Sequence, residues 1–256
     1  MIDTMMVTTS AVDLPIGYAD GQGTVHRHAT IRKLRGTDEM LFYDATLSGA
    51  ELVTQLIQRC LVQLGTLRVI EPALVNQLYS ADRNYLLYEL RRITFGNELR
   101  TAYICPSCEH PVQRVENLSE LRVRRLADGE RPQDIVVQLV DGYVDQSKVA
   151  HKEITLTLPR GTDEAFVSKQ AETDFLQARD ALLLCCIKKF GSLPRAALEG
   201  YGVKILRDLT MGDRRVLHTA LSDAMPGVEF RRAIDCDHCG ASFDAVLDVS
   251  DFFGVS

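Results

Sequence analysis

Two Cys-x-x-Cys motifs hold four of the seven cysteines of the 256-residue chain: Cys105 with Cys108, and Cys236 with Cys239. A tetrahedral zinc site takes about four soft ligands, and a Cys-x-x-Cys turn between two short strands, called a zinc knuckle, supplies two thiolates. Each motif is therefore half of a site. The halves of one site normally lie within about 15 to 20 residues of each other, whereas 127 residues separate Cys108 from Cys236. Only a fold that joins distant segments completes one site.

Two other interpretations of these cysteines stay open. A thioredoxin-like redox centre requires a Cys-x-x-Cys motif at a helix N-terminus, where the helix dipole lowers the thiol pKa. Both motifs are instead followed by short alternating stretches that contain Pro111 or Phe243, which favours strands. The four cysteines could otherwise be unligated thiols. A zinc site in which His110 or His238 replaces one cysteine is disfavoured, because neither histidine has a counterpart beside the other motif.

An internal repeat indicates how the two motifs meet. Three collinear blocks match in the two parts of the chain: residues 14–39 with 139–164, residues 60–67 with 186–193, and residues 82–108 with 213–239. The first block shares 11 of 26 residues and ends in RGTDE in both copies, and the last block contains both cysteine motifs. Collinear matches with small insertions between them indicate a duplication.

We therefore predict two copies of one unit, joined by a polar linker that holds Gly129 and Pro132. The predicted divisions are an N-terminal tail (residues 1–13), a first unit (14–121), a linker (122–138) and a second unit (139–256).

The predicted fold class is α+β, with a β-hairpin, helices and a zinc-knuckle hairpin in each unit. By analogy with symmetric homodimers, equivalent surfaces of the two units are expected to meet about a pseudo-twofold axis, as an internal pseudo-dimer. The two knuckles then face each other. Cys105, Cys108, Cys236 and Cys239 would complete one structural zinc site that ties the units together.

Each unit is expected to open with a β-hairpin, whose second strand covers residues 26–34 or 152–158. RGTDE follows as a joint between this strand and a helix. Thr37 and Thr162 are the predicted N-caps, with two acidic residues in the first turn, where the helix dipole favours negative charge.

Two helices are predicted in each unit. Apolar residues at helical spacing carry the first helix as far as Gly65 or Gly191, and the second starts at Asp82 or Asp213. Short strands on either side of the Cys-x-x-Cys turns close the units, at residues 101–104, 111–115, 232–234 and 243–247.

Composition and charge limit the possible functions. With 46% hydrophobic residues the chain can bury a real core, and a net charge of −6 argues against a nucleic-acid partner. The sequence has no run of eighteen apolar residues and no secretory leader pattern. We expect a soluble, cytosolic protein without direct membrane insertion.

The remaining candidates for chemistry do not assemble into an active site. His26 and His151 are equivalent, but no serine or cysteine nucleophile with a positioned base accompanies them, so a structural role is expected. The acidic residues of RGTDE are better helix caps than a catalytic pair. Asp82 with Arg83, like Asp213 with Arg214, is expected to cap a helix and pair locally, although a solvent-facing arginine there could dock a partner. Core packing is predicted for the other three cysteines, Cys60, Cys185 and Cys186.

The order of these motifs resembles the T4-type phage baseplate protein family, also called baseplate hub assembly chaperones. The resemblance rests on the RGTDE joint, the helix DRNYLLYEL, ICPSC with VQRVENLSEL, LTLPRGTDEAFV, and CDHCGASFDAVLDVSDFF. Relatives are encoded by contractile-tailed phages and bacterial contractile injection systems. The resemblance implies a non-enzymatic baseplate component or assembly factor that binds other baseplate or tail-hub proteins in the bacterial cytoplasm. Its cysteine positions fall on Cys105, Cys108, Cys236 and Cys239. Retention in the finished particle and oligomeric state stay open.

The first hypothesis is therefore a duplicated α+β scaffold, clamped by zinc, that binds or chaperones other baseplate proteins. The alternative is a zinc-ribbon nucleic-acid adaptor, which predicts a basic face around Arg114, Arg122, Arg124 and Arg125. A dithiol oxidoreductase, which predicts a depressed thiol pKa, ranks last.

Overall fold

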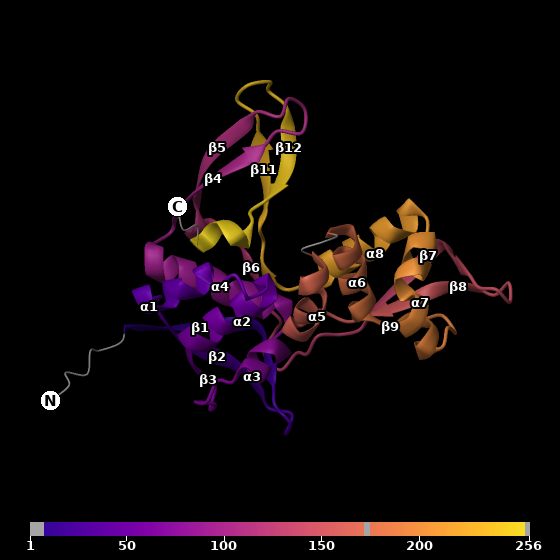
Figure 1. Cartoon of the computed structure of the whole chain (residues 1–256), viewed down its shortest axis with the longest axis horizontal. Coiled ribbons are helices and arrows are strands. Elements are labelled where there is room, and N and C mark those ends of the chain that lie inside the picture. Colours follow the sequence, from indigo (N-terminus) through magenta and orange to yellow (C-terminus); the bar gives the residue numbers. More distant parts are fainter. Residues whose placement is uncertain (1–7, 172–174, 254–256) are drawn as a thin grey trace.

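The computed structural model describes residues 8–171 and 175–253. The chain is α+β, as predicted, and Figure 1 shows its two halves side by side, with the first half in indigo and magenta. Of the predicted tail, residues 1–7 lie outside the described residues, and Thr9 already begins a strand.

The two halves share most of their order of elements, and among the described residues η1, β6 and β10 lack a counterpart in the other half. The first half contains β1 (Thr9–Ala19), β2 (Val25–Arg32), α1 (Gly36–Glu39), η1 (Met40–Tyr43), α2 (Gly49–Cys60), β3 (Leu61–Leu64), α3 (Pro72–Gln77), α4 (Ser80–Phe95), β4 (Glu98–Ile104), β5 (Pro111–Asn117), η2 (Leu118–Glu120) and β6 (Val123–Arg124). The second half contains β7 (Ile135–Val144), β8 (Ala150–Leu156), α5 (Gly161–Ala171), α6 (Phe175–Cys186), β9 (Ile187–Phe190), α7 (Arg195–Asp208), α8 (Met211–Ala224), β10 (Gly227–Val228), β11 (Arg231–Asp235), β12 (Ser242–Val246) and η3 (Val249–Phe253).

Each half begins with the predicted β-hairpin, which belongs to a three-stranded antiparallel sheet of order β1-β2-β3 or β7-β8-β9. The register of both hairpins shifts just before Tyr18 or Tyr143. Gly17 and Gly142 occupy the shift with φ of 93° and 75°. A Cβ at Gly142 would lie 2.4 Å from the carbonyl oxygen of His151, so the close approach of the strands requires glycine there.

The third strands were missed, because the prediction extended the first helix of each unit to Gly65 or Gly191. α2 and α6 end at Cys60 and Cys186, and the next four residues form β3 and β9. The two end residues of each strand are buried against the sheet: Leu61 and Leu64 in β3, and Ile187 and Phe190 in β9. Their spacing of three also suits a helix, so periodicity alone could not separate the two structures. The helices α3 and α7 had no predicted counterpart.

The predicted N-caps Thr37 and Thr162 were wrong. The N-cap of α1 is Arg35, and its backbone N–H donates to the Asp38 carboxylate at 2.9 Å. The Arg160 N–H donates to Asp163 at 2.8 Å in the same way. A carboxylate at the third helical position reaches back to the residue before the helix, so the aspartate rather than the threonine supplies the capping oxygen.

The hairpin of the second half packs on the first half. β4–β5 and β11–β12 stand together above α4 in Figure 1. Ile234, Cys236, Leu247 and Phe252 join the hydrophobic core of the first half, and η3 contacts α4. β6, from within the predicted linker, pairs with β10 in antiparallel fashion. The remaining core of the second half, around β7–β9 and α6–α8, forms a separate cluster.

A second junction joins the halves far from the hairpins. The Ser80 N–H donates to the Pro159 carbonyl at 2.9 Å, and the Gly161 N–H donates to the Leu78 carbonyl at 3.0 Å. The two hairpins that carry the cysteine motifs contact each other, whereas this junction joins the start of α4 to the start of α5.

Candidate metal centre

The two Cys-x-x-Cys turns have the same backbone structure. The Cys105 N–H donates to the His110 carbonyl at 3.0 Å and the Glu109 N–H to the Cys105 carbonyl at 2.8 Å. In the second turn the Cys236 N–H donates to the Ala241 carbonyl at 2.9 Å, and the Gly240 N–H donates to the Cys236 carbonyl at 2.9 Å. Both turns link antiparallel strands, β4 to β5 and β11 to β12. The local sequence therefore forms two knuckles, as predicted.

In both turns, the residue whose N–H donates to the carbonyl of the first cysteine adopts a left-handed conformation. Gly240 has φ of 73°, and Glu109, at the equivalent position, has φ of 58°. A residue with a Cβ pays a steric cost in this region that glycine does not. The first knuckle therefore carries local backbone strain that the second avoids.

The four sulfur atoms converge on one point between the hairpins. Cys105 Sγ lies 3.7 Å from Cys239 Sγ, and Cys108 Sγ lies 3.7 Å from Cys236 Sγ. All four lie within 4.8 Å of one another. A tetrahedron with Zn–S bonds of about 2.3 Å has sulfur atoms about 3.8 Å apart. The predicted meeting of the two motifs is confirmed, and the donor set fits a metal ion of the zinc type.

Burial and charge make a bound cation favourable here. Cys105 and Cys236 are 0% and 3% exposed and belong to the core around α4. Burial disfavours the Cys105 thiolate, but the N–H groups of Ser107 and Cys108 and two neighbouring thiols outweigh burial and lower the pKa of Cys105 to about 7. The His110 N–H favours the Cys108 thiolate, yet burial and the three other cysteines raise its pKa to about 12. Four thiolates this close repel one another, and a divalent cation removes that repulsion.

The two histidines of the turns lie beside the cluster and not in it. The rings of His110 and His238 stack with centroids 4.9 Å apart and an angle of 18° between their planes. His110 Nε2 lies 3.9 Å from the Asp237 carboxylate. Among the described residues the converging ligand set consists of the four cysteines.

Polar contacts reinforce the join between the hairpins. Arg114 on β5 donates to the Asp235 carbonyl at 2.6 Å, and Arg232 on β11 donates to the Glu116 carboxylate at 3.2 Å. These contacts cross between the first and second hairpins on the strands that carry the cysteines. The site is thus part of a larger interface between the two parts of the chain.

A thioredoxin-like arrangement is not what the two motifs form. Both turns lead into strands, β5 and β12, instead of a helix N-terminus. The other cysteines lie elsewhere: Cys60 and Cys186 are 0% exposed, and burial raises the pKa of each thiol to about 12. Cys185 is half-buried. Cys60 and Cys186 behave as core residues, as predicted.

The paired histidines of the opening hairpins are buried. His26 Nε2 lies 2.9 Å from the Asp20 carboxylate, and His151 Nε2 lies 3.3 Å from that of Asp145. The Ser192 N–H donates to His151 Nδ1 at 3.2 Å. A glycine lies against each ring. A Cβ at Gly65 would lie 2.3 Å from Nδ1 of His26, and a Cβ at Gly191 would lie 2.7 Å from Nδ1 of His151. The rings therefore brace the sheet instead of facing a substrate.

The expectation for Asp82 and Arg83 was wrong in its partners. Asp82 accepts from the N–H groups of Ile16 and Gly17 in β1, at 2.8 and 2.9 Å. Arg83 is 0% exposed, not solvent-facing, and its Nε donates to Glu164 of the second half at 2.8 Å. Local pairing failed because α2 and α5 cover the start of α4 and Arg83 Nη1 donates to the Val75 carbonyl of α3 at 3.2 Å.

Arg160 was not singled out from the sequence, yet it anchors the second junction. Its guanidinium lies 4.0 Å from the centre of the Tyr79 ring and donates to the Tyr79 hydroxyl at 2.7 Å. The repeated RGTDE segment was the available signal. It was assigned to a joint between a strand and a helix, which explains the sequence without any contact between the halves.

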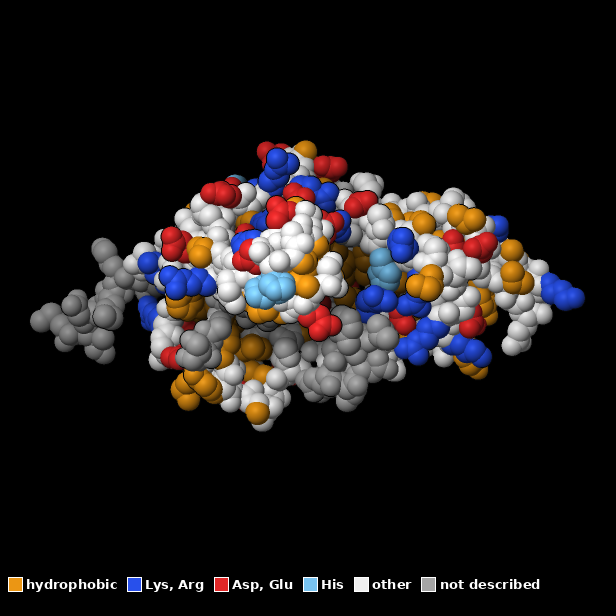
Figure 2. Space-filling model, turned by 90° about the horizontal axis from the view of Figure 1, so that it is seen from above, with side chains coloured by type: hydrophobic (Ala, Val, Ile, Leu, Met, Phe, Trp, Pro, Cys, Tyr) orange, Lys and Arg blue, Asp and Glu red, His pale blue; other side chains and the backbone are white. Residues whose placement is uncertain are grey.

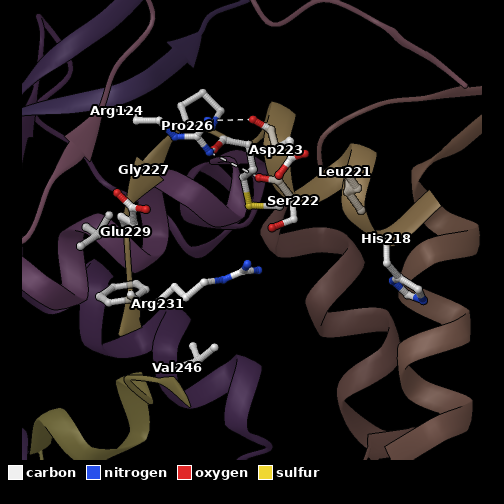
Figure 3. Close-up of a pocket in the computed structure, with 13 residues that line it drawn as sticks. Arg124, His218, Leu221, Ser222, Asp223, Pro226, Gly227, Glu229, Arg231 and Val246 are labelled. Atoms are coloured by element: carbon white, nitrogen blue, oxygen red, sulfur yellow. Dashed lines mark hydrogen bonds between the residues drawn. The ribbon is translucent and has the colours of Figure 1, made fainter. Parts of the chain in front are cut away.

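A cleft of about 580 Å³ lies between the end of α8 and the segment that enters β11. Figure 2 shows it from above as a hollow between the halves. Arg231 extends into it, while Arg124 donates to the carbonyls of Asp223 and Met225 at 2.7 and 2.5 Å (Figure 3). His218 Nε2 is buried and has no hydrogen-bond partner among the described residues. The lining contains no paired nucleophile and base.

Membrane insertion through a helix finds no support in the described part of the chain, where every helix is too short or too polar to span a bilayer.

Comparisons with known proteins agree with the resemblance seen in the motifs. The family model described as T4 bacteriophage base plate protein matches residues 9–254, nearly the whole chain. No curated protein matches the chain, and no solved structure matches it. The matched span contains both hairpins and all four converging cysteines. The chain therefore belongs to the T4 bacteriophage base plate protein family.

Proposed function

We propose that the protein is a non-enzymatic baseplate component or assembly factor of a phage-tail-like contractile injection machine, acting as a zinc-clamped scaffold for other baseplate or tail-hub proteins. The observation that carries the proposal is the convergence of four thiols from two distant hairpins. The family match supports the assignment of the protein to a baseplate.

The proposed clamp is one structural Zn²⁺ held by Cys105, Cys108, Cys236 and Cys239. A four-thiolate zinc is coordinatively closed, so it contributes stability and not catalysis. Its binding free energy becomes folding free energy for the segments it joins. Here these are β4–β5 and β11–β12, and the clamp would hold the end of the second half against α4.

The proposed origin of this arrangement is a tandem duplication, with units 14–121 and 139–256 around the linker 122–138. The similar element order of the halves, apart from η1, β6 and β10, and the reciprocal sulfur contacts support it. A pseudo-twofold axis would pass through the cysteine cluster and relate the two hairpins. The globular parts of the halves depart from that axis, because their junction joins the start of α4 to the start of α5.

The clamped hairpins offer a surface to partner proteins. Ile104 on β4, Val115 on β5 and Val246 on β12 are 61%, 62% and 66% exposed. Apolar side chains on exposed strand faces suit contact with another protein surface. Zinc would fix the relative position of these strands and so pre-organise the surface for binding.

The function is tested by particle assembly in the bacterium that carries the gene. Deleting the gene should abolish sheathed particles in electron micrographs, and the wild-type gene should restore them. Cys105→Ser should fail to restore them, whereas Cys185→Ser, which changes a half-buried cysteine outside the cluster, should succeed. Normal particles after deletion would overturn the proposal. Immunoblots of purified particles would then separate a retained component from an assembly factor of the cytoplasm.

The nucleic-acid alternative finds little support in the predicted basic face. Three of its four arginines donate to protein groups: Arg114 to the Asp235 carbonyl, Arg124 to the Met225 carbonyl and Arg125 to the Tyr85 hydroxyl. With a net charge of −6, we expect no salt-sensitive retention of DNA or RNA in a filter-binding titration.

A further inference from the structure

The junction between the two halves joins two surfaces of different kind. One surface is the second RGTDE segment (residues 160–164), and the other is the start of α4 (residues 77–83). Arg160 donates to the Gln77 carbonyl at 2.5 Å and to the Tyr79 hydroxyl at 2.7 Å. Because the two surfaces differ, the contact is heterologous, and a contact of this kind leaves one surface of each type unused.

A glycine lets the two surfaces approach closely. A Cβ on Gly161 would lie 2.7 Å from Nη1 of Arg83 and 2.8 Å from its Cζ. The arginine passes over this glycine, and its Nε meets the Glu164 carboxylate at 2.8 Å. The junction therefore depends on Gly161 and Glu164 of the second RGTDE segment and on Arg83 of α4.

The unused counterparts of both surfaces are exposed. The first RGTDE segment (residues 35–39) corresponds to residues 160–164, and the start of α8 (residues 208–214) corresponds to residues 77–83 of the sequence alignment. Gly36 is exposed where Gly161 is buried. Met211, at the start of α8, is 86% exposed, whereas the equivalent Ser80 is 6% exposed.

Arg214 at the start of α8 makes one backbone contact that is equivalent to a contact of Arg83 at the start of α4. Arg214 Nη1 donates to the Leu206 carbonyl at 3.1 Å, as Arg83 Nη1 donates to the equivalent Val75 carbonyl at 3.2 Å. The Arg214 side chain is 18% exposed and that of Arg83 is 0% exposed. The difference corresponds to the missing cover, since α5 lies over Arg83.

Charge is complementary between the two unused surfaces. Asp208 stands at the position of Gln77, so an arriving Arg35 would find a carboxylate beside the backbone carbonyl that corresponds to the one Arg160 contacts. Glu39 would meet Nε of Arg214 as Glu164 meets Nε of Arg83, while Arg214 Nη2 keeps its bond to Asp180 at 2.5 Å. Arg35, Glu39 and Asp208 are all exposed in the single chain.

Gly36 supplies an independent reason to expect an occupant. A Cβ placed on Gly36 meets nothing within 4 Å. The fold of the first half therefore does not require glycine at this position, yet the residue is the same as the one that Arg83 demands at position 161. A glycine without a local role fits a surface that another arginine covers.

We propose that residues 35–39 of one molecule dock on residues 208–214 of a second copy of this chain, so that the internal junction is repeated between molecules. Each molecule then offers one surface of each kind, and association proceeds head to tail, into a ring or an open filament. Thr210 replaces Tyr79 at the receiving surface, so the arginine–tyrosine stack is absent and the contact between copies is weaker than the internal one.

The test is sedimentation velocity of the zinc-loaded full chain over a concentration series. The wild type should move from monomer to larger species as concentration rises. Arg35→Asp alone and Asp208→Arg alone should stay monomeric. A mixture of these two variants should associate again, because each new charge finds its opposite on the other molecule. A wild type that stays monomeric at its solubility limit, or association that survives both single variants, would overturn the proposal.

A steric variant separates docking from charge effects. Gly36→Ala should raise the dissociation constant by about tenfold or more, a change of about 1.4 kcal/mol, because the new methyl group would press on Arg214 of the second molecule. Gly200→Ala on α7, where a Cβ also meets nothing within 4 Å, is the matched control and should associate like the wild type. Equal association of the two variants would contradict the proposed contact.

Discussion

α4 and α8 occupy the same place in the two halves and share the pattern Asp-Arg followed by leucines, yet their surroundings differ. α4 buries most of its sixteen residues, arginine and glutamate included, whereas the buried residues of α8 are Asp213 and Leu217. α4 contacts β1, β10, η3, α2 and α5, while the main partner of α8 is β7. One sequence pattern thus produces a central helix and a peripheral helix, and the difference comes from what the rest of the chain places on each.

The hairpins explain this difference. In the first half, β4–β5 follows α4 and stays beside it; in the second half, β11–β12 leaves α8 and packs on the first half. The cleft between the end of α8 and the segment entering β11 lies where the hairpin departs. The four cysteines converge where this hairpin meets β4–β5 of the first half.

The largest expected difference between the halves concerns their paired arginines. Arg83→Met should lower the free energy of unfolding by about 3 to 5 kcal/mol, because it leaves Glu164 and buried carbonyls without their donor. Arg214 donates to the Asp180 carboxylate at 2.5 Å, and Arg214→Met should cost about 1 to 2 kcal/mol, because Asp180 keeps a second partner, Arg207, at 3.0 Å. Urea unfolding of the zinc-loaded protein measures both. Equal losses would show that the two arginines do the same work and would break the comparison.

The paired aspartates should differ in pH dependence. Burial raises the pKa of Asp82 to about 7. The folded state then holds a proton that the unfolded state releases near its value of 3.8, so stability falls as pH rises from about 4 to 7. Burial acts the same way on Asp213, but the N–H groups of Gly142, Val140 and Asp141 outweigh it and lower its pKa. Its contribution is present above about pH 4 and is lost as pH falls further.

Asn variants isolate these two contributions. The free energy of unfolding of Asp82→Asn relative to that of the wild type should rise by about 1 to 3 kcal/mol as the pH increases from 4 to 7. Asp213→Asn should cost about 1 to 2 kcal/mol near pH 7 and progressively less below pH 4. Urea midpoints across this pH range provide the measurement. Parallel pH curves for the two variants would contradict the opposite shifts.

The smallest difference lies in the two knuckles. Glu109→Gly should stabilise the protein by about 0.5 to 1 kcal/mol, because glycine relieves the left-handed conformation at φ of 58°. Gly240→Ala should destabilise it by about 1 kcal/mol, for the same reason at φ of 73°. Shifts of about 2 to 4 °C per kcal/mol in the thermal midpoint are expected at this size. A shift of the same sign in both variants would mean that the turns are not equivalent.

Much of the local structure was predictable because it depends on neighbours in the sequence. The opening hairpins, the RGTDE joint and the strands around each cysteine motif appear where alternation and turn residues place them. The cysteine cluster was predictable for a different reason, since the matched blocks put two half-sites at equivalent positions. Cys105, Cys108, Cys236 and Cys239 then needed only to face each other.

The parts that could not be predicted depend on tertiary partners. Leu61 and Leu64 fit a helix by spacing and form β3 because β2 offers a free edge. Arg83 looks like a surface residue and is buried because α5 of the other half covers it. The departure of β11–β12 from its own half follows from tertiary contacts that the matched sequence blocks do not distinguish.

The central claim is that one metal ion ties the two halves through four thiolates, and X-ray absorption at the zinc edge on the purified full chain tests it most directly. The account predicts one zinc per chain with four sulfur neighbours at about 2.3 Å, and loss of that signal in both Cys105→Ser and Cys236→Ser. A metal-free protein that is as stable as the zinc-loaded protein would contradict it. A zinc ion with nitrogen ligands from His110 or His238 would contradict it as well.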